Sequence, residues 1–494
     1  MKEILIDPIT RLEGHGKIHL FVKDDGELAN AYFQVPELRG FEKFCQGRPV
    51  EEMARITTRI CGVCPDAHHM VAAKAADAVY GVEIPSAARK LRELQYNAFY
   101  AGDHCTHFYA LAGPDFVCGP DAPPAERNIL GVIAKVGIDA GKKVIRQRAM
   151  SQRIIEIIGG KKVHPVTALP GGMSKRITKE EQQEMIGFGK EMVEFAKFTI
   201  QVFDDIVLKN KAYVDLILSD TYTHKTYSMG LVDKNNKVNF YDGDVRVVAP
   251  DGSQHARYQP KDYLDYVAEH VEPFSYLKYP FLKKIGWKGF VDGMDSGVYK
   301  ATPLSRLNVS NGMATPLAQE QYGRFYETLT GDKSGKTPVH PTLATHWARV
   351  IELVFACEAT LQQAQDDEIT SEKILNPPTG IVGEGVGIVE APRGTLTHHY
   401  KTDKHGIITE ANLIVGTTNN HAAISMSIKK AAQGLIKKGT EITNGTLNRI
   451  EMAFRAYDPC FGCATHSFPG SMPLEVIVHD DESGEIIQTV RRNA

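Results

Sequence analysis

Two Cys-x-x-Cys pairs lie near opposite ends of the chain, Cys61 with Cys64 and Cys460 with Cys463. Four thiolates favour soft or borderline metals, namely zinc, nickel, copper(I) or iron–sulfur clusters. A zinc ribbon usually separates its pairs by roughly 15–20 residues, because one small loop wraps the metal. Here most of the chain lies between the pairs. The spacing favours a large enzyme that closes remote segments around a reactive metal, with a structural zinc site or separate redox dithiols as alternatives.

The residues around the first pair suit such a site. Gly62 allows a tight bend, so that both sulfurs can face one centre. Arg59 and His68 lie close enough in sequence to donate hydrogen bonds to the sulfurs. Four further cysteines have no partner in sequence, and we expect them to pack as small apolar side chains. They are Cys45, Cys105, Cys118 and Cys357.

Length and composition limit the class of protein. A chain of 494 residues can hold two to four domains at roughly 150 residues each. The net charge of −3 gives no sign of a nucleic-acid groove or an anionic membrane surface. No apolar run approaches the roughly 18 residues that span a bilayer, and the N-terminal segment lacks the apolar core of a signal peptide. Cysteines without disulfide-like crowding lead us to expect a cytoplasmic setting.

Hydrophobic periodicity predicts an α+β fold that is mainly helical. The whole of residues 1–466 reads as one intertwined body, followed by a separate tail. The expected parts are an N-terminal β segment at 1–35, a helical core at about 50–218, a β excursion at about 228–260 and a C-terminal α+β part at 312–466. Within the helical core, long helical stretches are expected at 85–112, 126–159 and 178–218. The C-terminal part should contain helix at 312–375, strands near 386–391 and 407–415 and a last helix around 418–437.

The contexts of the two pairs carry a family resemblance. Arg-Ile-Cys-Gly-Val-Cys and Asp-Pro-Cys-Phe-Gly-Cys-Ala-Thr-His resemble the paired signatures of the nickel–iron hydrogenase large subunit. Other segments have counterparts in the same order, namely residues 7–15, 38–42, 103–109, 164–172 and 390–394. The resemblance implies that family's fold, with long central helices and small peripheral sheets. It is similar in particular to the soluble multimeric group, which includes NAD-reducing and heterodisulfide-reductase- or methyl-viologen-linked types.

The resemblance also implies a cofactor. The four sulfurs would bind nickel, with Cys61 and Cys460 as terminal ligands. Cys64 and Cys463 would bridge to an iron that carries carbon monoxide and cyanide. This centre splits dihydrogen, the substrate, and Cys460 would accept the proton.

Two charged residues would serve that centre. Glu13 matches the family's proton gate, although a strand carboxylate paired with Arg11 is the ordinary alternative. Arg393 matches the arginine above the open face of the metals, and otherwise it reads as a surface or salt-bridge arginine. Asp103 and Asp458 match the carboxylates that orient this arginine; they could instead be a helix-surface charge and a turn former.

A further group of residues resembles cofactor and metal contacts. Thr417 resembles the hydroxyl residue that hydrogen-bonds an iron-bound cyanide, although Gly416 departs from the proline often found beside it, and a buried structural threonine is the alternative. Glu42 and His466, with a backbone carbonyl near Leu413, match the ligands of a second divalent ion, magnesium. Glu42 suits a helix N-terminus equally well.

The implied function is the catalytic component of a cytoplasmic hydrogenase that interconverts dihydrogen with protons and electrons. Too few spare cysteines remain for an electron-transfer chain, so the electrons must pass to an iron–sulfur small subunit. Further flavin or heterodisulfide reductase modules would follow. The alternatives are an energy-converting hydrogenase, a protein similar to an electron-coupling component of respiratory complex I and, from another class, a structural zinc protein.

The tail after His466 suggests processing. Residues 472–478 read as a strand, and residues 481–484 read as a turn. The family's precursor is usually cleaved after this histidine once nickel is inserted. We therefore expect residues 467–494 to be a maturation peptide, which implies a maturation protease and nickel-insertion factors as partners.

Overall fold

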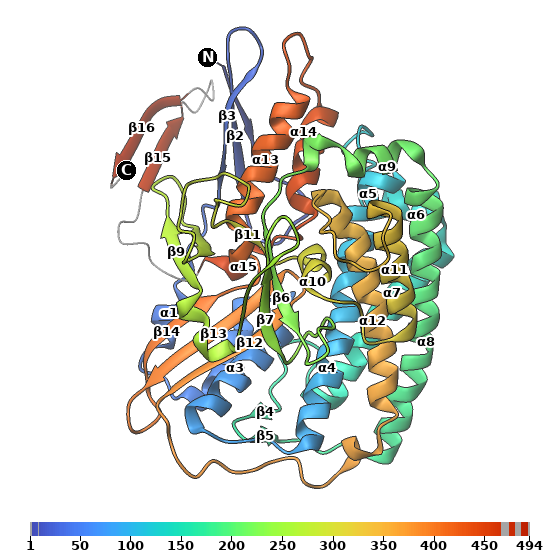
Figure 1. Cartoon of the computed structure of the whole chain (residues 1–494), viewed down its shortest axis with the longest axis vertical. Coiled ribbons are helices and arrows are strands. Elements are labelled where there is room, and N and C mark those ends of the chain that lie inside the picture. Colours follow the sequence, from blue (N-terminus) through green and yellow to red (C-terminus); the bar gives the residue numbers. More distant parts are fainter. Residues whose placement is uncertain (1, 8, 466–473, 480–485, 493–494) are drawn as a thin grey trace.

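A group of long helices lies side by side along one side of the molecule (Figure 1). The computed structural model describes residues 2–7, 9–465, 474–479 and 486–492. In it α12 packs against α4, α8 and α11, and α7 packs against α4 and α8. These helices are α4 (Ser86–Thr106), α7 (Ile138–Gly159), α8 (Lys179–Phe203), α11 (Pro316–Thr330) and α12 (Thr345–Ala364). The mainly helical α+β class is therefore confirmed.

Local signals decide where these helices begin and end. A capping box starts α8, because Thr178 Oγ1 accepts from the Glu181 amide and the Glu181 carboxylate accepts from the Thr178 amide. The continuous helix expected at 126–159 is wrong, because Gly137 adopts φ 94° and separates α6 (Ile129–Val136) from α7. Gly331, with φ 78°, likewise ends α11 and opens the loop that precedes α12.

The continuous helix expected at 178–218 is also interrupted. After α8 the chain forms a π-helical turn, η4 (Asp204–Leu208), and then begins α9 (Lys211–Leu218). Asn210 caps α9 by accepting from the Ala212 amide, so a new helix starts there.

A three-stranded antiparallel sheet forms the N-terminal part of the fold. It consists of β1 (Lys2–Ile6), β2 (Lys17–Val22) and β3 (Leu28–Gln34), paired in that order. Alternate residues of β2 are buried, as the period of a strand requires. Helix α13 (His421–Leu435) packs against β3, so distant parts of the sequence share one core.

A second antiparallel sheet carries Arg393 in the turn between two of its strands. Its strands are β12 (Glu384–Ala391), β13 (Gly394–Thr402) and β14 (Ile408–Ile414), and α3 (Pro65–Tyr80) packs against β12 and β13. Gly385 and Gly387 make this contact possible, because a Cβ there would lie 2.4 and 2.3 Å from carbonyl oxygens of α3. The sequence did not indicate β13, whose first seven residues are all buried and show no alternation.

The remaining elements are short. A four-stranded sheet in the order β11-β6-β7-β8 occupies the expected β excursion and gains β11 from further along the chain. The other strands are β4 (Ala168–Leu169), β5 (Gly172–Met173), β6 (Tyr227–Val232), β7 (Asp244–Val248), β8 (Gln254–Tyr258), β9 (Val267–Val271), β10 (Lys278–Leu282), β11 (Tyr299–Lys300), β15 (Leu474–His479) and β16 (Ile486–Arg492). The other helices are α1 (Phe41–Cys45), α2 (Met53–Ile56), α5 (Gly113–Val117), α10 (Pro303–Val309), α14 (Asn444–Arg455) and α15 (Phe461–Ala464). Across the described ranges, no helix has both the length and the apolar character that a membrane span requires.

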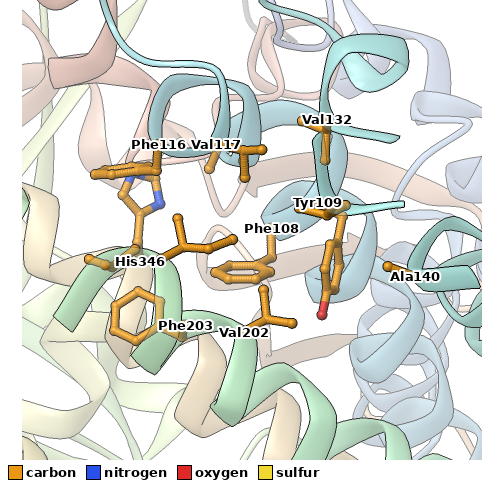
Figure 2. Close-up of a pocket in the computed structure, with 14 residues that line it drawn as sticks. Phe108, Tyr109, Phe116, Val117, Val132, Ala140, Val202, Phe203 and His346 are labelled. Atoms are coloured by element: carbon orange, nitrogen blue, oxygen red, sulfur yellow. The ribbon is translucent and has the colours of Figure 1, made fainter. Parts of the chain in front are cut away.

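A small apolar cavity lies among α5, α6, α8 and the π-helical turn η3 (His107–Ala112). Figure 2 shows Phe108 and Tyr109 of η3 in this cavity, with His346 of α12 beside Phe116. Burial lowers the pKa of His346 to about 3, so its ring is uncharged at neutral pH. None of the four paired cysteines lines this cavity, and the reactive groups lie elsewhere.

Candidate metal centre

The fold brings the four paired cysteines together. The sulfur of Cys61 lies 3.4 Å from that of Cys460, and the sulfur of Cys64 lies 3.3 Å from that of Cys463. All four Sγ atoms lie within 4.8 Å of one another, and all four residues are buried. These distances exceed the roughly 2.05 Å of a disulfide bond. Within the described residues, this is the one group of three or more His, Cys, Asp or Glu side chains that is arranged to hold a metal ion.

Each pair sits where a helix begins. Cys64 directly precedes α3, whose first residue is Pro65, a position that proline favours. Cys61 Sγ accepts from the amides of Val63 and Cys64, at 3.1 and 3.3 Å. The expected bend at Gly62 is present, and both sulfurs face one centre. Its φ is not positive and the space beyond it is open, so the bend does not need a conformation that only glycine adopts.

The second pair is tied to the N-terminal segment. Cys460 precedes the short helix α15, and its amide donates to Thr417 Oγ1 at 3.0 Å. The backbone of Glu13 bonds on both sides of Cys460, accepting from Phe461 at 3.0 Å and donating to Pro459 at 3.3 Å. Residues from the two ends of the sequence thus meet at one sulfur, because Cys460 Sγ contacts both Glu13 and Cys61.

The electrostatics of this site fit a bound cation. Burial raises the pKa of the Cys460 and Cys463 thiols well above the ordinary value. Several buried thiolates within this small volume would repel one another, and a divalent metal ion reverses that penalty because it binds the deprotonated form. The donor set is therefore suited to a metal that takes four sulfurs.

Glu13 approaches the sulfurs from the half-exposed side. Its Oε2 lies 3.0 Å from Cys460 Sγ and accepts from the Gly462 amide at 2.9 Å. Burial, followed by the nearby Cys61, raises the pKa of Glu13 above its ordinary value. The alternative pairing with Arg11 is wrong, because the Arg11 guanidinium bonds to Asp115 instead.

Arg393 is buried near the sulfurs, close enough for the Cys460 and Cys64 side chains to affect its pKa. Its Nη1 lies 3.0 Å from Asp103 Oδ2, and its Nη2 lies 2.8 Å from Asp458 Oδ2. Although burial opposes the charge, these two carboxylates raise the pKa of Arg393 well above its ordinary value.

The surface reading of Arg393 is therefore wrong, whereas its salt-bridge reading is confirmed. The helix-surface reading of Asp103 is wrong because this residue is buried. Asp458 does close a turn, since its amide donates to the Arg455 carbonyl at 3.0 Å, and it also pairs with Arg393. Asp458 holds φ 55° directly before Pro459, a costly conformation for a residue that is not glycine.

Glu42 lies apart from the sulfurs, in the first turn of α1. Its Oε1 accepts from the Leu413 amide at 2.9 Å, and Lys278 Nζ lies 3.9 Å away. Burial raises the pKa of Glu42. The Leu413 backbone therefore lies beside Glu42, and the binding of an ion by a carbonyl there stays a prediction. His466 lies outside the described residues.

Two other expectations about the sulfurs differ from the structure. Arg59 donates to the Arg55 carbonyl and to Thr58 Oγ1, and no bond links it to a sulfur. His68 is buried, its Nδ1 lies 3.2 Å from His398 Nε2, and its own Nε2 has no hydrogen-bond partner. Burial lowers the pKa of His68 to about 4, so this ring is neutral. The four unpaired cysteines are free and buried, as expected.

Sequence reasoning missed two residues that shape the site. The Arg39 guanidinium donates to the carbonyls of Ile60 and Gly462, and so bridges the two cysteine segments. Asn420 donates through Nδ2 to the Arg393 carbonyl at 2.7 Å. Arg39 lies in one of the ordered segments that carry the resemblance, but its role depends on a contact across most of the chain.

Known proteins with this arrangement identify the family. A sequence profile described as "Nickel-dependent hydrogenase" matches residues 39–128 and 216–466, and one described as "HoxL-like" matches residues 3–38. The chain belongs to the nickel-dependent hydrogenases. It is the catalytic large subunit of such an enzyme, which rules out the structural zinc protein.

Individual hydrogenases agree over nearly their full length. The chain is 50% identical over 491 residues to a component of the F420-non-reducing hydrogenase of Archaeoglobus profundus, covering 99% of this chain and 100% of the relative. It is 37% identical over 494 residues to the beta component of the NAD-reducing hydrogenase HoxS of Cupriavidus necator, covering 97% of each. A solved NAD+-reducing [NiFe]-hydrogenase in the H2-reduced state superposes with a TM-score of 0.87 at 33% identity, covering 94% of this chain and 100% of that one.

Proposed function

We propose that Cys61, Cys64, Cys460 and Cys463 hold a nickel–iron centre, with Cys61 and Cys460 on nickel alone and the other two shared with iron. The observation that carries the proposal is the meeting of four buried sulfurs with a carboxylate 3.0 Å from one of them. When bound, the centre would supply heterolytic cleavage of dihydrogen, its iron carrying carbon monoxide and cyanide. The surrounding residues of the chain would move the proton, hold charge and exclude water.

Glu13 serves as the proton acceptor. A general base must lie within about 2.6–3.2 Å of the group it deprotonates, and Glu13 Oε2 meets this requirement at Cys460 Sγ. The Gly462 amide fixes the same oxygen, so the carboxylate stays directed at the sulfur. Because Glu13 is only partly buried, it can pass the proton onward to the protein surface.

Arg393 serves as a fixed positive charge beside the sulfurs. It is fully charged at any physiological pH, and Asp103 and Asp458 hold both ends of its guanidinium. A preorganised charge in a site that excludes water stabilises developing negative charge strongly, because nothing needs to reorganise during the reaction. Arg393 would thus orient and polarise dihydrogen at the centre.

Thr417, His68 and Glu42 take supporting roles in this proposal. Thr417 already holds the Cys460 amide, and its hydroxyl would also face a cyanide of the iron. His68 packs near Cys61 as a neutral ring and limits access of water. Glu42 and His466, with the backbone at Leu413, would bind magnesium, and the half-buried carboxylate of Glu42 suits a hard cation.

The electrons need a partner. We propose an iron–sulfur small subunit, followed by flavin or heterodisulfide reductase modules, working in the cytoplasm. The relatives named F420-non-reducing hydrogenase are 40–50% identical to this chain, against 37% for the NAD-reducing one. This ranking favours an acceptor other than F420. Purified complex supplied with dihydrogen should reduce a viologen dye but not F420, and membrane proteins that co-purify would instead favour the energy-converting alternative.

Residues 467–494 would be removed during maturation. The family profile stops at residue 466, and 94% of this chain covers the whole solved hydrogenase chain. A maturation protease and nickel-insertion factors would therefore act on the precursor. The intact mass of nickel-replete enzyme tests this directly, because active protein that retains all 494 residues would exclude cleavage.

Metal analysis with infrared spectroscopy of the purified complex tests the centre itself. We expect equal amounts of nickel and iron in each chain, together with carbon monoxide and cyanide stretching bands. Folded protein that contains zinc, shows none of these bands and does not react with dihydrogen would contradict the proposal.

A further inference from the structure

The turn that carries Arg393 is held from behind by another arginine. Strands β12 and β13 are joined by Pro392 and Arg393 alone, since Ala391 pairs with Gly394. Arg306, on helix α10, donates through Nη1 to the Ala391 carbonyl and through Nη2 to the Pro392 carbonyl, both at 3.1 Å. The guanidinium therefore binds the two backbone carbonyls that directly precede Arg393.

The same guanidinium is anchored by two carboxylates. Glu352 of α12 accepts from Nε at 2.6 Å and from Nη2 at 2.7 Å, and Glu390 of β12 accepts from Nη1 at 3.0 Å. With the two carbonyls, these bonds use all five N–H groups of Arg306. Arg306, Glu352 and Glu390 are each 0% exposed, so the arrangement is set within the core.

The two carboxylates also accept hydrogen bonds from α4 and from the strands β6 and β13. His104 of α4 lies 2.8 Å from Glu352 through Nε2. Glu390 accepts from the Leu231 amide at 2.8 Å and from Thr395 Oγ1 at 2.9 Å. Hydrogen bonds thus connect α4, α10 and α12 to the turn at Pro392. If Arg306 were displaced, the turn would lose these contacts.

Arg306 and Glu352 stabilise each other's charged forms. Burial opposes ionisation of Glu352, but the neighbouring Arg306 lowers the pKa of Glu352 to about 2. Glu352, followed by Tyr100, raises the pKa of Arg306 well above its ordinary value against the effect of burial. Burial raises the pKa of Glu390, although Arg306 and two hydrogen-bond donors oppose this shift. Removing Arg306 or Glu352 would leave the other charge buried without its partner, and this destabilises the folded protein.

We infer that Arg306 is a positioning residue for catalysis, acting through the Ala391 and Pro392 carbonyls to hold Arg393 over the metal cysteines. Arg306 touches neither a sulfur nor the substrate site. The inference rests on the proposed role of Arg393. A lysine cannot replace this arginine, because its ammonium lacks the planar fork that serves two carboxylates and two carbonyls together.

The test compares Arg306→Lys with a matched control, Arg92→Lys, in the complete nickel-loaded complex. Arg92 is equally buried, pairs with Asp77 and donates to the carbonyls of Leu169 and Gly172 at 2.8 and 2.9 Å. It holds the turn between β4 and β5, away from the cysteines. Both variants should lose thermal stability, since each loses buried hydrogen bonds.

Only Arg306→Lys should change the chemistry. We expect its dihydrogen turnover per bound nickel to fall roughly 10–100-fold, because small displacements of a catalytic group carry costs of this size. Its carbon monoxide and cyanide bands should shift, since the Arg393 charge moves relative to the centre. Arg92→Lys should keep the wild-type bands and turnover per nickel. Equal turnover and equal bands in the two variants would overturn the inference.

A double-mutant cycle and a milder variant complete the design. If Arg306 acts through Arg393, Arg306→Lys should add little further loss in an Arg393→Lys background, whereas full additivity would contradict the inference. Glu390→Gln replaces one carboxyl partner of Arg306 with an amide and should show the same band shift to a smaller degree, even if Arg306→Lys does not fold. A wild-type complex without nickel or activity would refute the proposed function, a result distinct from failure of this inference.

Discussion

The two sides of the metal site are built in different ways. Glu13 lies on an irregular segment between β1 and β2, half-exposed, with one carboxylate oxygen bonded to the Gly462 amide. Arg393 lies on a tight turn between two strands, 4% exposed, with carboxylates on both ends of its guanidinium and a second arginine behind it. A group that exchanges protons must reach water, whereas a group that supplies a constant field must be kept from it.

The irregular Glu13 segment is nevertheless held firmly. Arg11 and Arg455 both bond to Asp115, which anchors the chain just before Glu13. Gly14 follows with φ 85°, and a Cβ there would lie 2.8 Å from the Gly462 amide nitrogen. Close contact between this segment and the second cysteine pair therefore requires glycine at position 14.

The largest effect should come from Cys460, whose sulfur contacts both Glu13 and Cys61. Cys460→Ser replaces a soft thiolate with a hydroxyl that binds nickel poorly, so we expect the purified protein to lose its nickel and all dihydrogen turnover. Elemental analysis measures the loss. Cys357→Ala is the control, because that buried cysteine lies outside the sulfur group and should leave nickel content unchanged. Nickel retained in Cys460→Ser would refute the ligand assignment.

Breaking the half-exposed side should give the next largest effect. Glu13→Gln keeps the size of the side chain but removes its ability to accept a proton, and general base catalysis is worth roughly 10²–10⁴-fold. We expect turnover to fall within that range while nickel and iron contents stay normal. Glu37→Gln, a nearby carboxylate that contacts His15, serves as the control and should retain activity. Normal turnover in the Glu13 variant would remove it from the proton path.

Breaking the enclosed side should cost less but change the field at the metals. Arg393→Lys keeps the charge but cannot hold Asp103 and Asp458 together, so we expect a loss of roughly 10²-fold in turnover with metals retained. Infrared bands of the iron ligands should shift in this variant and stay unchanged in Glu13→Gln. If both variants shift the bands equally, the proposed division into a proton acceptor, Glu13, and a fixed charge, Arg393, is wrong.

The smallest effect concerns stability in acid and belongs to the enclosed side alone. The pKa of Glu352 is about 2 in the folded protein against an ordinary value of 4.5. A lowered folded pKa stabilises the protein above pH 4.5, and this stabilisation, on the order of a few kcal/mol, disappears as the pH falls towards 2. The unfolding free energies of wild type and Glu352→Gln should therefore converge over that interval.

Denaturant unfolding at several pH values measures this convergence. Glu372→Gln, which replaces an exposed carboxylate, should change the unfolding free energy little throughout. A difference between wild type and Glu352→Gln that stays constant from neutral pH down to about pH 2 would show that Arg306 does not hold Glu352 ionised.

Local patterns predicted much of the fold but missed its interruptions. The helix expected at 85–112 corresponds to α4 and η3, because its apolar spacing continues without a break. The break at Gly137 was missed because the apolar spacing continues across it, although its positive φ ends a helix. Strand β13 was missed because both of its faces are buried, so the alternation that marks a half-buried strand is absent.

Short local segments were enough to predict which residues would carry the chemistry. The cysteine pairs, Glu13 and Arg393 lie in short segments whose residue types and order could be compared with those of a family. Such a comparison needs only the local sequence. The secondary structure near them is also largely local. These features therefore needed no knowledge of distant contacts.

How those residues are held and how their pKa values shift could not be predicted from the sequence, because both depend on the folded core. Arg306, Glu352 and Glu390 stand in separate segments without any shared motif, and their partnership arises because α10, α12 and β12 pack together in the core. Burial and neighbouring charges set the pKa values of Glu13 and Glu352 in opposite directions. Both quantities depend on distances between residues far apart in the chain, which no local pattern contains.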